Sequence, residues 1–277
     1  MTERPTPYIG ISGVIGTDQQ YYLMDQFVWQ GLDERPAFRQ IALGVKAVHK
    51  TQFLDVENKY GPDWYPVGAQ SFETALDGGG IQALRVAQVY LDSDFVGDPQ
   101  YRDAFVARIC KRGKAWLNAL QFDMLPWHTD STVLSFMERV KDETGFTILL
   151  QAHSDAMRYN APNELVRKLA QYAHVADYVL FDASHGKGVQ LDPQALRPYL
   201  GAAYESTALQ STGMALAGGL NARVVRDTLP EILQQFPDIS WDAEGQLHPV
   251  QPDGTRPIDM HVAKQYLEAS GDILRAL

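Results

Sequence analysis

Short apolar runs alternate with helical stretches along the whole chain, and this alternation constrains the fold more than any other feature. Eight runs have strand character, at residues 8–12, 41–48, 84–91, 116–122, 146–150, 178–181, 214–217 and 239–241. Apolar residues at helical spacing fill most of the intervals, at 19–30, 99–111, 131–142, 162–174, from 193, 222–235 and 259–274. Such alternation implies parallel strands joined by helical crossovers.

Eight strand–helix units in 277 residues predict a single (β/α)₈ TIM barrel domain that spans residues 1–277. An open doubly wound sheet is the alternative, because periodicity does not show whether a sheet closes. No Gly-x-Gly-x-x-Gly turn follows the first strand to favour a dinucleotide fold. Residues 49–80 are interpreted as an elaborated loop or insertion after the second strand, with room for one short helix.

The composition narrows the class of protein. The chain has one cysteine, Cys110, and a net charge of −10. One thiol cannot form an internal disulfide, which suits a reducing compartment. No apolar run approaches the ~20 residues of a membrane span, and an acidic balance disfavours nucleic acid. We therefore expect a cytoplasmic globular protein that binds a small molecule but neither nucleic acid nor a membrane, and a homodimer stays open.

Polar residues close most of the apolar runs, where a barrel places its active site. These residues are Ser12, Lys46, His49, Asp92, Asp94, Gln121, Asp123, Gln151, His153, Asp182, Ser184, Asp242 and Glu244. A set of carboxylates with an imidazole and an ammonium suits proton transfer on a polar small molecule. Asp182 and Asp242 directly follow apolar strand residues, where an idle carboxylate would be costly.

Several of these residues also fit a purely structural interpretation. Asp92 could cap the next helix, His153 could belong to a capping turn, and His49 could be a solvated loop residue. Two glycine-rich turns follow the sixth and seventh runs and carry Gly186, Gly188, Gly218 and Gly219. Bare amides at a helix N-terminus bind anions, but a tight turn needs glycine as well.

Four stretches of the chain, at residues 11–14, 117–123, 179–188 and 216–221, match the strand ends and turns of a known family. In these stretches the chain resembles phosphoribosylanthranilate isomerase, a (β/α)₈ enzyme. It covers roughly residues 8–18 and 84–275 and fails over 49–80. The resemblance implies an acid/base isomerisation of an aminoaldose phosphate, in which Asp182 matches the general acid.

Three positions depart from the pattern of that family. Ser12 stands where the family has a basic cysteine, Asp123 stands in place of a histidine, and Glu244 falls within the phosphate-holding turn after the eighth strand. An unactivated serine hydroxyl has no useful basicity near neutral pH. A glutamate repels a phosphate dianion unless a cation intervenes.

These observations predict a diverged barrel enzyme with isomerase-type acid/base chemistry on a sugar-containing or sugar-phosphate molecule, without a cofactor or a metal. Asp182 would be the general acid/base, with Asp123 or His153 as its partner and Ser12 positioning the substrate. The substrate-binding positions are Lys46, Asp92, Gln121, Gln151, Ser184, Gly186, Gly188, Gly218, Gly219, Asp242 and Glu244. Two alternatives stay open: a metal-dependent hydrolase or lyase that uses the Asp and His cluster, and a non-catalytic small-molecule-binding barrel.

Overall fold

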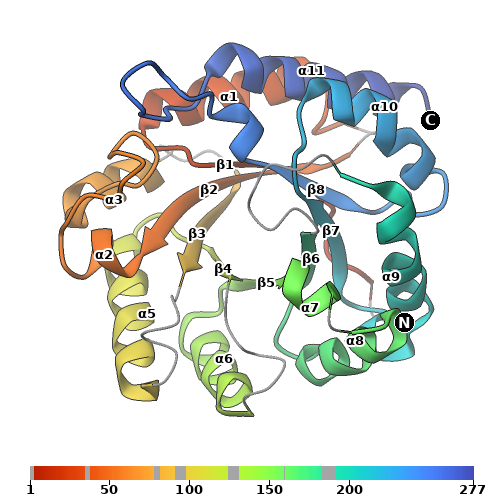
Figure 1. Cartoon of the computed structure of the whole chain (residues 1–277), viewed down its shortest axis with the longest axis horizontal. Helices are drawn as coiled ribbons and strands as arrows, with labels where there is room; N and C mark the ends of the chain where they lie inside the picture. Colours follow the sequence, from red (N-terminus) through yellow and green to blue (C-terminus); the bar gives the residue numbers. More distant parts are fainter. Residues whose placement is uncertain are drawn as a thin grey trace.

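A computed structural model shows a closed barrel of eight parallel strands, in the order of the sequence, surrounded by helices (Figure 1). It describes residues 3–34, 38–77, 82–90, 98–123, 131–158, 160–182 and 191–277. The last strand pairs with the first, with Gly10 opposite Asp242. The predicted (β/α)₈ fold is therefore confirmed, and the open sheet is excluded.

The strands are β1 (Tyr8–Ser12), β2 (Gln40–Val48), β3 (Leu84–Tyr90), β4 (Ala119–Asp123), β5 (Thr147–His153), β6 (Tyr178–Asp182), β7 (Gly213–Ala217) and β8 (Ser240–Ala243). The described α-helices are α1 (Thr17–Trp29), α2 (His49–Gln52), α3 (Gly68–Leu76), α5 (Pro99–Gly113), α6 (Ser131–Thr144), α7 (Ser154–Arg158), α8 (Pro162–Leu169), α9 (Pro193–Glu205), α10 (Ala222–Leu233) and α11 (Met260–Arg275). Short 3₁₀ turns cover 170–172, 207–209 and 245–247. None of the described helices is long and apolar enough to cross a bilayer.

Two strands differ from the prediction by three residues at one end. β4 begins at Ala119 because Trp116 and Leu117 still belong to the turn that ends α5, where both backbone amides donate to the carbonyl of Gly113. β5 continues to His153, three residues past the predicted end, because its polar residues face the barrel interior and still pair with β6. Polarity therefore marks the inner face of these strands rather than their ends.

The segment 49–80 contains the second crossover. α3 buries Phe72, Ala75 and Leu76 against the sheet and its neighbouring helices, so it occupies the place of the helix that follows β2 in a barrel. α2 precedes it, and residues 53–67 between the two helices have no regular structure. Within that stretch Trp64 and Tyr65 are buried, and the loop is thereby tied to the barrel.

Helix starts follow local sequence signals. Asp192 accepts hydrogen bonds from the amides of Gln194 and Ala195 at the start of α9, and Asn221 accepts one from Val224 at the start of α10. Each side chain satisfies amide groups that have no partner within the helix. The caps at Asp192 and Asn221 thus fix where α9 and α10 begin.

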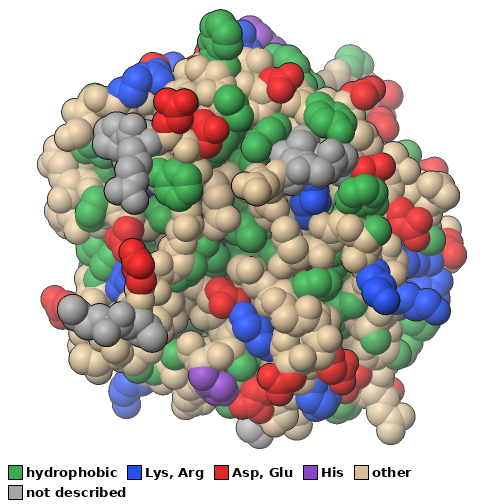
Figure 2. All heavy atoms as spheres, turned by 180° about the vertical axis from the view of Figure 1, so that it is seen from behind, with side chains coloured by type: hydrophobic (Ala, Val, Ile, Leu, Met, Phe, Trp, Pro, Cys, Tyr) green, Lys and Arg blue, Asp and Glu red, His purple; other side chains and the backbone are tan. Residues whose placement is uncertain are grey.

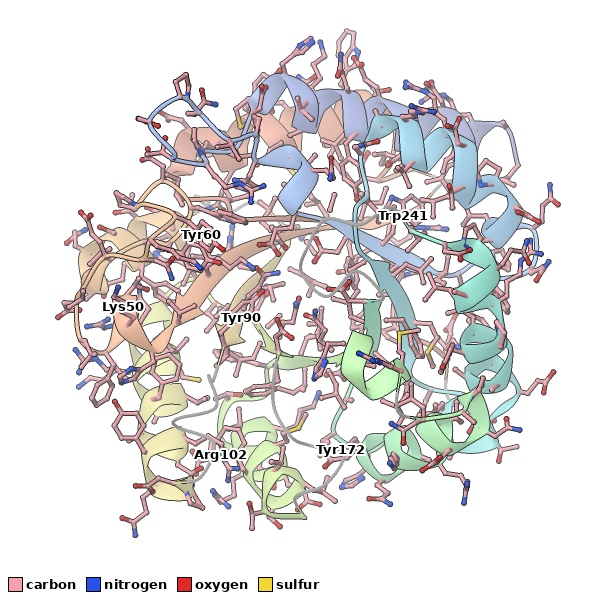
Figure 3. The ribbon with its side chains drawn as sticks, in the orientation of Figure 1. Lys50, Tyr60, Tyr90, Arg102, Tyr172 and Trp241 are labelled. Carbon is pink, nitrogen blue, oxygen red and sulfur yellow. The ribbon has the colours of Figure 1, made fainter. Side chains whose placement is uncertain are left out.

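The strands separate two apolar regions. Outward residues such as Trp241 pack under the helices, and the indole of Trp241 donates to Ser270 Oγ of α11 at 3.2 Å (Figure 3). Inward residues fill the lower interior with Tyr8, Ala42, Leu84, Val86, Ala119, Leu149, Tyr178, Leu180 and Ala215. The upper interior, at the carboxyl ends of the strands, is polar. On the face seen in Figure 2, acidic and basic side chains are interspersed over the helices.

Gly213 leaves room for an aromatic pair in the lower interior. Tyr8 and Tyr178 meet edge to face at 5.2 Å, and a Cβ on Gly213 would come within 2.7 Å of Tyr178 Cε1. We expect Gly213→Ala to lower the free energy of unfolding by about 1–3 kcal/mol through overpacking. Gly201→Ala is the control, because a Cβ on this α9 residue meets no atom within 4 Å. Urea denaturation measures both, and equal stabilities of the two variants would contradict the prediction.

Candidate active site

The polar residues at the upper ends of the strands share one face of the sheet. Partnered residues of neighbouring parallel strands point to the same side, and Lys46, Gln88 and Gln121 are partners in successive pairs. The same parity that places Leu84 and Val86 in the apolar interior places Gln88 and Tyr90 above them. The inward polar set comprises Ser12, Lys46, Gln88, Tyr90, Gln121, Asp123, Gln151, His153, Asp182 and Asp242.

Three glutamine side chains form a hydrogen-bonded chain across β3, β4 and β5. Gln88 Nε2 lies 3.5 Å from Gln121 Oε1, and Gln121 Nε2 donates to Gln151 Oε1 at 2.7 Å. Gln151 Nε2 then donates to Asp182 Oδ2 on β6 at 3.1 Å. The amide dipoles therefore point one after another toward the carboxylate of Asp182.

The same chain reaches a second carboxylate through Ser12. Gln88 Nε2 donates to Ser12 Oγ at 2.6 Å, and Ser12 Oγ donates to both oxygens of Asp242 at 3.1 Å. Both arms of the network thus end on a carboxylate, one on β6 and one on β8. An ionised carboxylate can only accept hydrogen bonds, so each acid must face a donor. The two acids therefore fix the orientation of every amide group between them.

Asp182 and Asp242 flank a small residue of β7. Asp182 pairs with Ala217, and Ala217 pairs with Asp242, so the three lie at one level of the inner wall. Both carboxylates remain 8% exposed, whereas Ser12 and the glutamines beneath them are more deeply buried. Ala217 has only a methyl group, so its side chain puts little volume between the two carboxylates.

Asp242 has a strongly raised pKa. Burial raises its pKa to about 7, and repulsion from Glu244 and Asp182 acts in the same direction, while Ser12 and Lys46 oppose it. The backbone makes room for this carboxylate, since a Cβ on Gly10 would come within 2.8 Å of Asp242 Cγ. Perturbed acids of this kind are concentrated in active sites.

Lys46 forms a second cluster beside the first. Its ammonium lies 2.5 Å from Glu244 Oε1 and 2.6 Å from the hydroxyl of Tyr90. Asp123 interacts with the same hydroxyl, and Tyr90 is labelled in Figure 3. Burial disfavours the ammonium, but the charge of Glu244 together with Tyr65 and Asp123 outweighs this and raises the pKa of Lys46. Lys46 is therefore a fixed cation rather than a nucleophile.

A stacked aromatic group supports the backbone next to Ser12. His248 stacks on Trp64 at 4.8 Å, and its Nε2 lies 2.9 Å from the carbonyl oxygen of Ser12. Burial lowers the pKa of His248, against the effect of its hydrogen bonds to the backbone of Ser12 and Arg256. Gly13, at φ +87°, is required here, because a Cβ would come within 2.8 Å of Trp64. The 53–67 loop thus supports the end of β1.

Eight residues selected from the sequence lie together at this end of the barrel: Ser12, Lys46, Gln121, Asp123, Gln151, Asp182, Asp242 and Glu244. His153 ends β5 in register with Asp182. Gly218 and Gly219 follow β7 with φ of +110° and +62°, as a tight turn requires. Asp92, Ser184, Gly186 and Gly188 lie outside the described residues.

Other residues depart from the sequence interpretation. His49, expected to be solvated, is buried outside the barrel, where it contacts Phe53, Tyr101 and Phe105. Gln88 and Tyr90 also belong to the site. Selecting only the polar residues at the end of each apolar run misses them. The alternation of the 84–90 strand carries the missing signal, since its inward positions turn from apolar to polar at Gln88. Tyr65 has no such signal in the sequence.

The described part of the chain contains no group of three or more His, Cys, Asp or Glu side chains arranged to hold a metal ion. The carboxylates are instead distributed around the wall. Asp182 and Asp242 bind amide and hydroxyl donors, while Glu244 binds an ammonium. The arrangement is suited to proton transfer and hydrogen bonding to a polar molecule.

No protein-family model matches this sequence, and a comparison with curated proteins finds no match. Among solved structures, the chain is similar to phosphoribosyl anthranilate isomerase from Thermotoga maritima, with a TM-score of 0.57 at 11% identity over 98% of this chain and 100% of that one. It is also similar to the catalytic domain of a hyperthermophilic chitinase from Pyrococcus furiosus, with a TM-score of 0.56 at 10% identity over 97% of each chain. At these identities the likeness shows that the chain has the (β/α)₈ fold of barrel enzymes.

Proposed function

We propose that the upper end of the barrel is the active site of an isomerase-type enzyme that transfers protons on a polyhydroxylated small molecule, with Asp182 and Asp242 as its acid/base pair. The observation that carries this proposal is the placement of the two carboxylates on either side of Ala217, each reached by one arm of the same amide chain. A barrel enzyme with two such groups can act on adjacent atoms of one substrate.

The two carboxyl groups would divide the reaction between them. One removes the proton from the carbon beside a carbonyl group, and the other donates a proton to the carbonyl oxygen. The resulting enediol collapses when the first group delivers its proton to the former carbonyl carbon and the second group takes the hydroxyl proton of the adjacent carbon, which becomes the new carbonyl group. Because the pKa of Asp242 lies at about 7, this group can both accept and release a proton at neutral pH.

The residues around the pair have positioning roles in this proposal. Ser12 holds Asp242 and does not itself act as a base, which agrees with the low basicity of a serine hydroxyl. Gln151 holds Asp182. Lys46, Asp123 and Glu244 would line the substrate site beside the pair, from β2, β4 and the segment after β8.

Hydrogen exchange tests the proposal whatever the product of the reaction is. The protein is incubated in D₂O with a panel of aldoses, aldose phosphates and glycosylamines, and NMR follows replacement of the hydrogen beside the carbonyl carbon. We expect exchange with at least one compound, and a loss of about 10²-fold or more in Asp182→Asn and in Asp242→Asn.

Asp227→Asn serves as the matched control, because Asp227 is 58% exposed on α10 and pairs only with its helical neighbour Arg223. This variant should retain the rate of the wild-type protein. Absence of exchange across the panel, or full exchange in both site variants, would overturn the proposed acid/base role.

A further inference from the structure

The charges that face the site are unequal. Three strand-borne carboxylates, Asp123, Asp182 and Asp242, face the interior, and Glu244 directly follows β8. Among the strand residues that the structure describes, Lys46 is the only lysine or arginine on this face, which also carries His153. The local field at the site is therefore set by carboxylates, whatever the net charge of the rest of the molecule.

The ammonium group of Lys46 is already paired with the carboxylate of Glu244. Lys46 is 1% exposed, and its ammonium is enclosed by Glu244 and the hydroxyl of Tyr90, with the aromatic ring of Tyr90 4.4 Å away. Glu244 is 28% exposed and lies on the outer side of the pair. An anionic group entering the barrel would meet the carboxylate of Glu244 before it could reach Lys46.

A second, independent feature indicates a missing donor. Gln88 is 1% exposed, and its Nε2 is used by Ser12 and Gln121, whereas no donor reaches its Oε1. A buried carbonyl oxygen without a hydrogen bond is costly. Gln88 shares its inward register with Lys46 and Gln121, so this acceptor belongs to the interior of the site. Gln88 therefore places an acceptor without a donor on the same inner face as the carboxylates.

We infer that the site takes a polyhydroxylated amine, such as an amino sugar, whose ammonium group lies between Asp182 and Asp242, and that it rejects phosphate esters. This inference rests on the proposed function and names its substrate class. An ammonium offers three donors to two carboxylates that repel one another, and hydroxyl groups supply the remaining donors. A hydroxyl group of the same ligand would supply the donor that Gln88 Oε1 lacks in the described structure.

A matched set of probes tests this inference by isothermal titration calorimetry. D-glucosamine, D-glucose and D-glucose 6-phosphate share one scaffold and differ in charge. We expect the amine to bind at least 10-fold more tightly than glucose, and the phosphate ester to bind more weakly than glucose. In Asp182→Asn and in Asp242→Asn the preference for the amine should fall at least 5-fold, while Asp227→Asn should leave it unchanged.

Proton release gives a readout that does not depend on affinity alone. An ammonium beside Asp242 favours the ionised carboxyl, so binding of glucosamine near pH 7 should release protons, and the observed heat should vary with the ionisation enthalpy of the buffer. The charged and titratable groups that act on Asp242 are Asp182, Glu244, Lys46, Tyr8 and Tyr266. Uptake of protons would contradict an ammonium at this position.

The outcomes separate this inference from the proposed function. Glucosamine binding no tighter than glucose, tighter binding of glucose 6-phosphate, or a larger increase in melting temperature with Mg²⁺, Ca²⁺ or Zn²⁺ than with glucosamine would each overturn the amine assignment. None of these results affects the exchange experiment in D₂O, which alone decides the acid/base role. Conversely, selective amine binding without any exchange would retain the ligand class and overturn the catalysis.

Discussion

Asp242→Asn is expected to stabilise the fold at pH 8 by roughly 4 kcal/mol while it removes turnover. The carboxyl group has a pKa of about 7 in the folded protein, against 3.8 for the unperturbed side chain. Between these two values the folded state retains a proton that the unfolded chain has released. The free energy of unfolding therefore decreases as the pH rises from 4 to 7 and stays low above 7. The asparagine side chain does not titrate in this pH range, so the free energy of unfolding of Asp242→Asn does not decrease in this way.

Urea denaturation at pH 4, 6 and 8 measures the effect as the difference between the two proteins. At pH 4 Asp242 is largely protonated in the folded state and about half protonated in the unfolded chain, so the wild-type protein and Asp242→Asn should differ little. The difference should increase toward pH 8. Asp227→Asn removes an exposed carboxyl and should show no comparable dependence. A difference that stays constant from pH 4 to pH 8 would mean that Asp242 titrates as an ordinary carboxyl group.

This stability cost has a functional explanation. Three features raise the energy of the ionised Asp242 carboxylate: its burial, the nearby Glu244, and Asp182 across Ala217. A sequence selected only for stability would replace an acid in such a place. Retention of the acid is consistent with a proton-transfer role, and an inactive Asp242→Asn that is more stable than the wild-type protein would be the expected signature of that role.

The barrel itself could be predicted because its signals are local. The alternation of apolar runs, the cap at Asp192 and the polar residues near the strand ends can all be recognised within short windows of sequence. The selected residues are at this end of the barrel because every strand of a parallel barrel runs in the same direction. The common direction of the strands was therefore enough to predict that most residues of the candidate site lie together.

The contacts between these residues could not be predicted in the same way. Ser12 and Asp242 are 230 residues apart and meet only because β8 pairs with β1. The register of each pair decides that Gln88 faces Gln121 and that Ala217 lies between two acids. Register depends on long-range closure and not on local pattern. The pKa of Asp242 follows from these contacts, so it was also beyond the reach of the sequence.

Glu244→Ala is expected to lower the free energy of unfolding by about 3 kcal/mol, although Glu244 itself is partly exposed. The reason lies in its partner, because Lys46 is 1% exposed and would keep a buried ammonium whose closest remaining contact is the hydroxyl of Tyr90. Removing one member of a buried ion pair leaves the other charge uncompensated, whereas replacing both can be nearly neutral. The double variant Lys46→Met/Glu244→Ala should therefore recover most of the lost stability.

A double-mutant cycle at pH 7 measures this coupling. The matched control is the exposed pair Lys264 and Glu268 on α11, whose charged atoms lie 3.7 Å apart. The same substitutions there should show a coupling of about 0.5 kcal/mol or less. A loss below about 1 kcal/mol in Glu244→Ala would show that Lys46 finds another counter-charge, with Asp123 as the nearest alternative.

Inorganic phosphate extends this experiment to ligand selection. In the wild-type protein Glu244 occupies the ammonium of Lys46, so millimolar phosphate should not change the melting temperature. In Glu244→Ala an anion can take the vacated position, so phosphate should restore part of the lost stability by binding only the folded state. Sulfate should do the same, and neither should act on the double variant, which has no ammonium to bind. Equal stabilisation of the wild-type protein by phosphate would show that Glu244 does not exclude anions from Lys46.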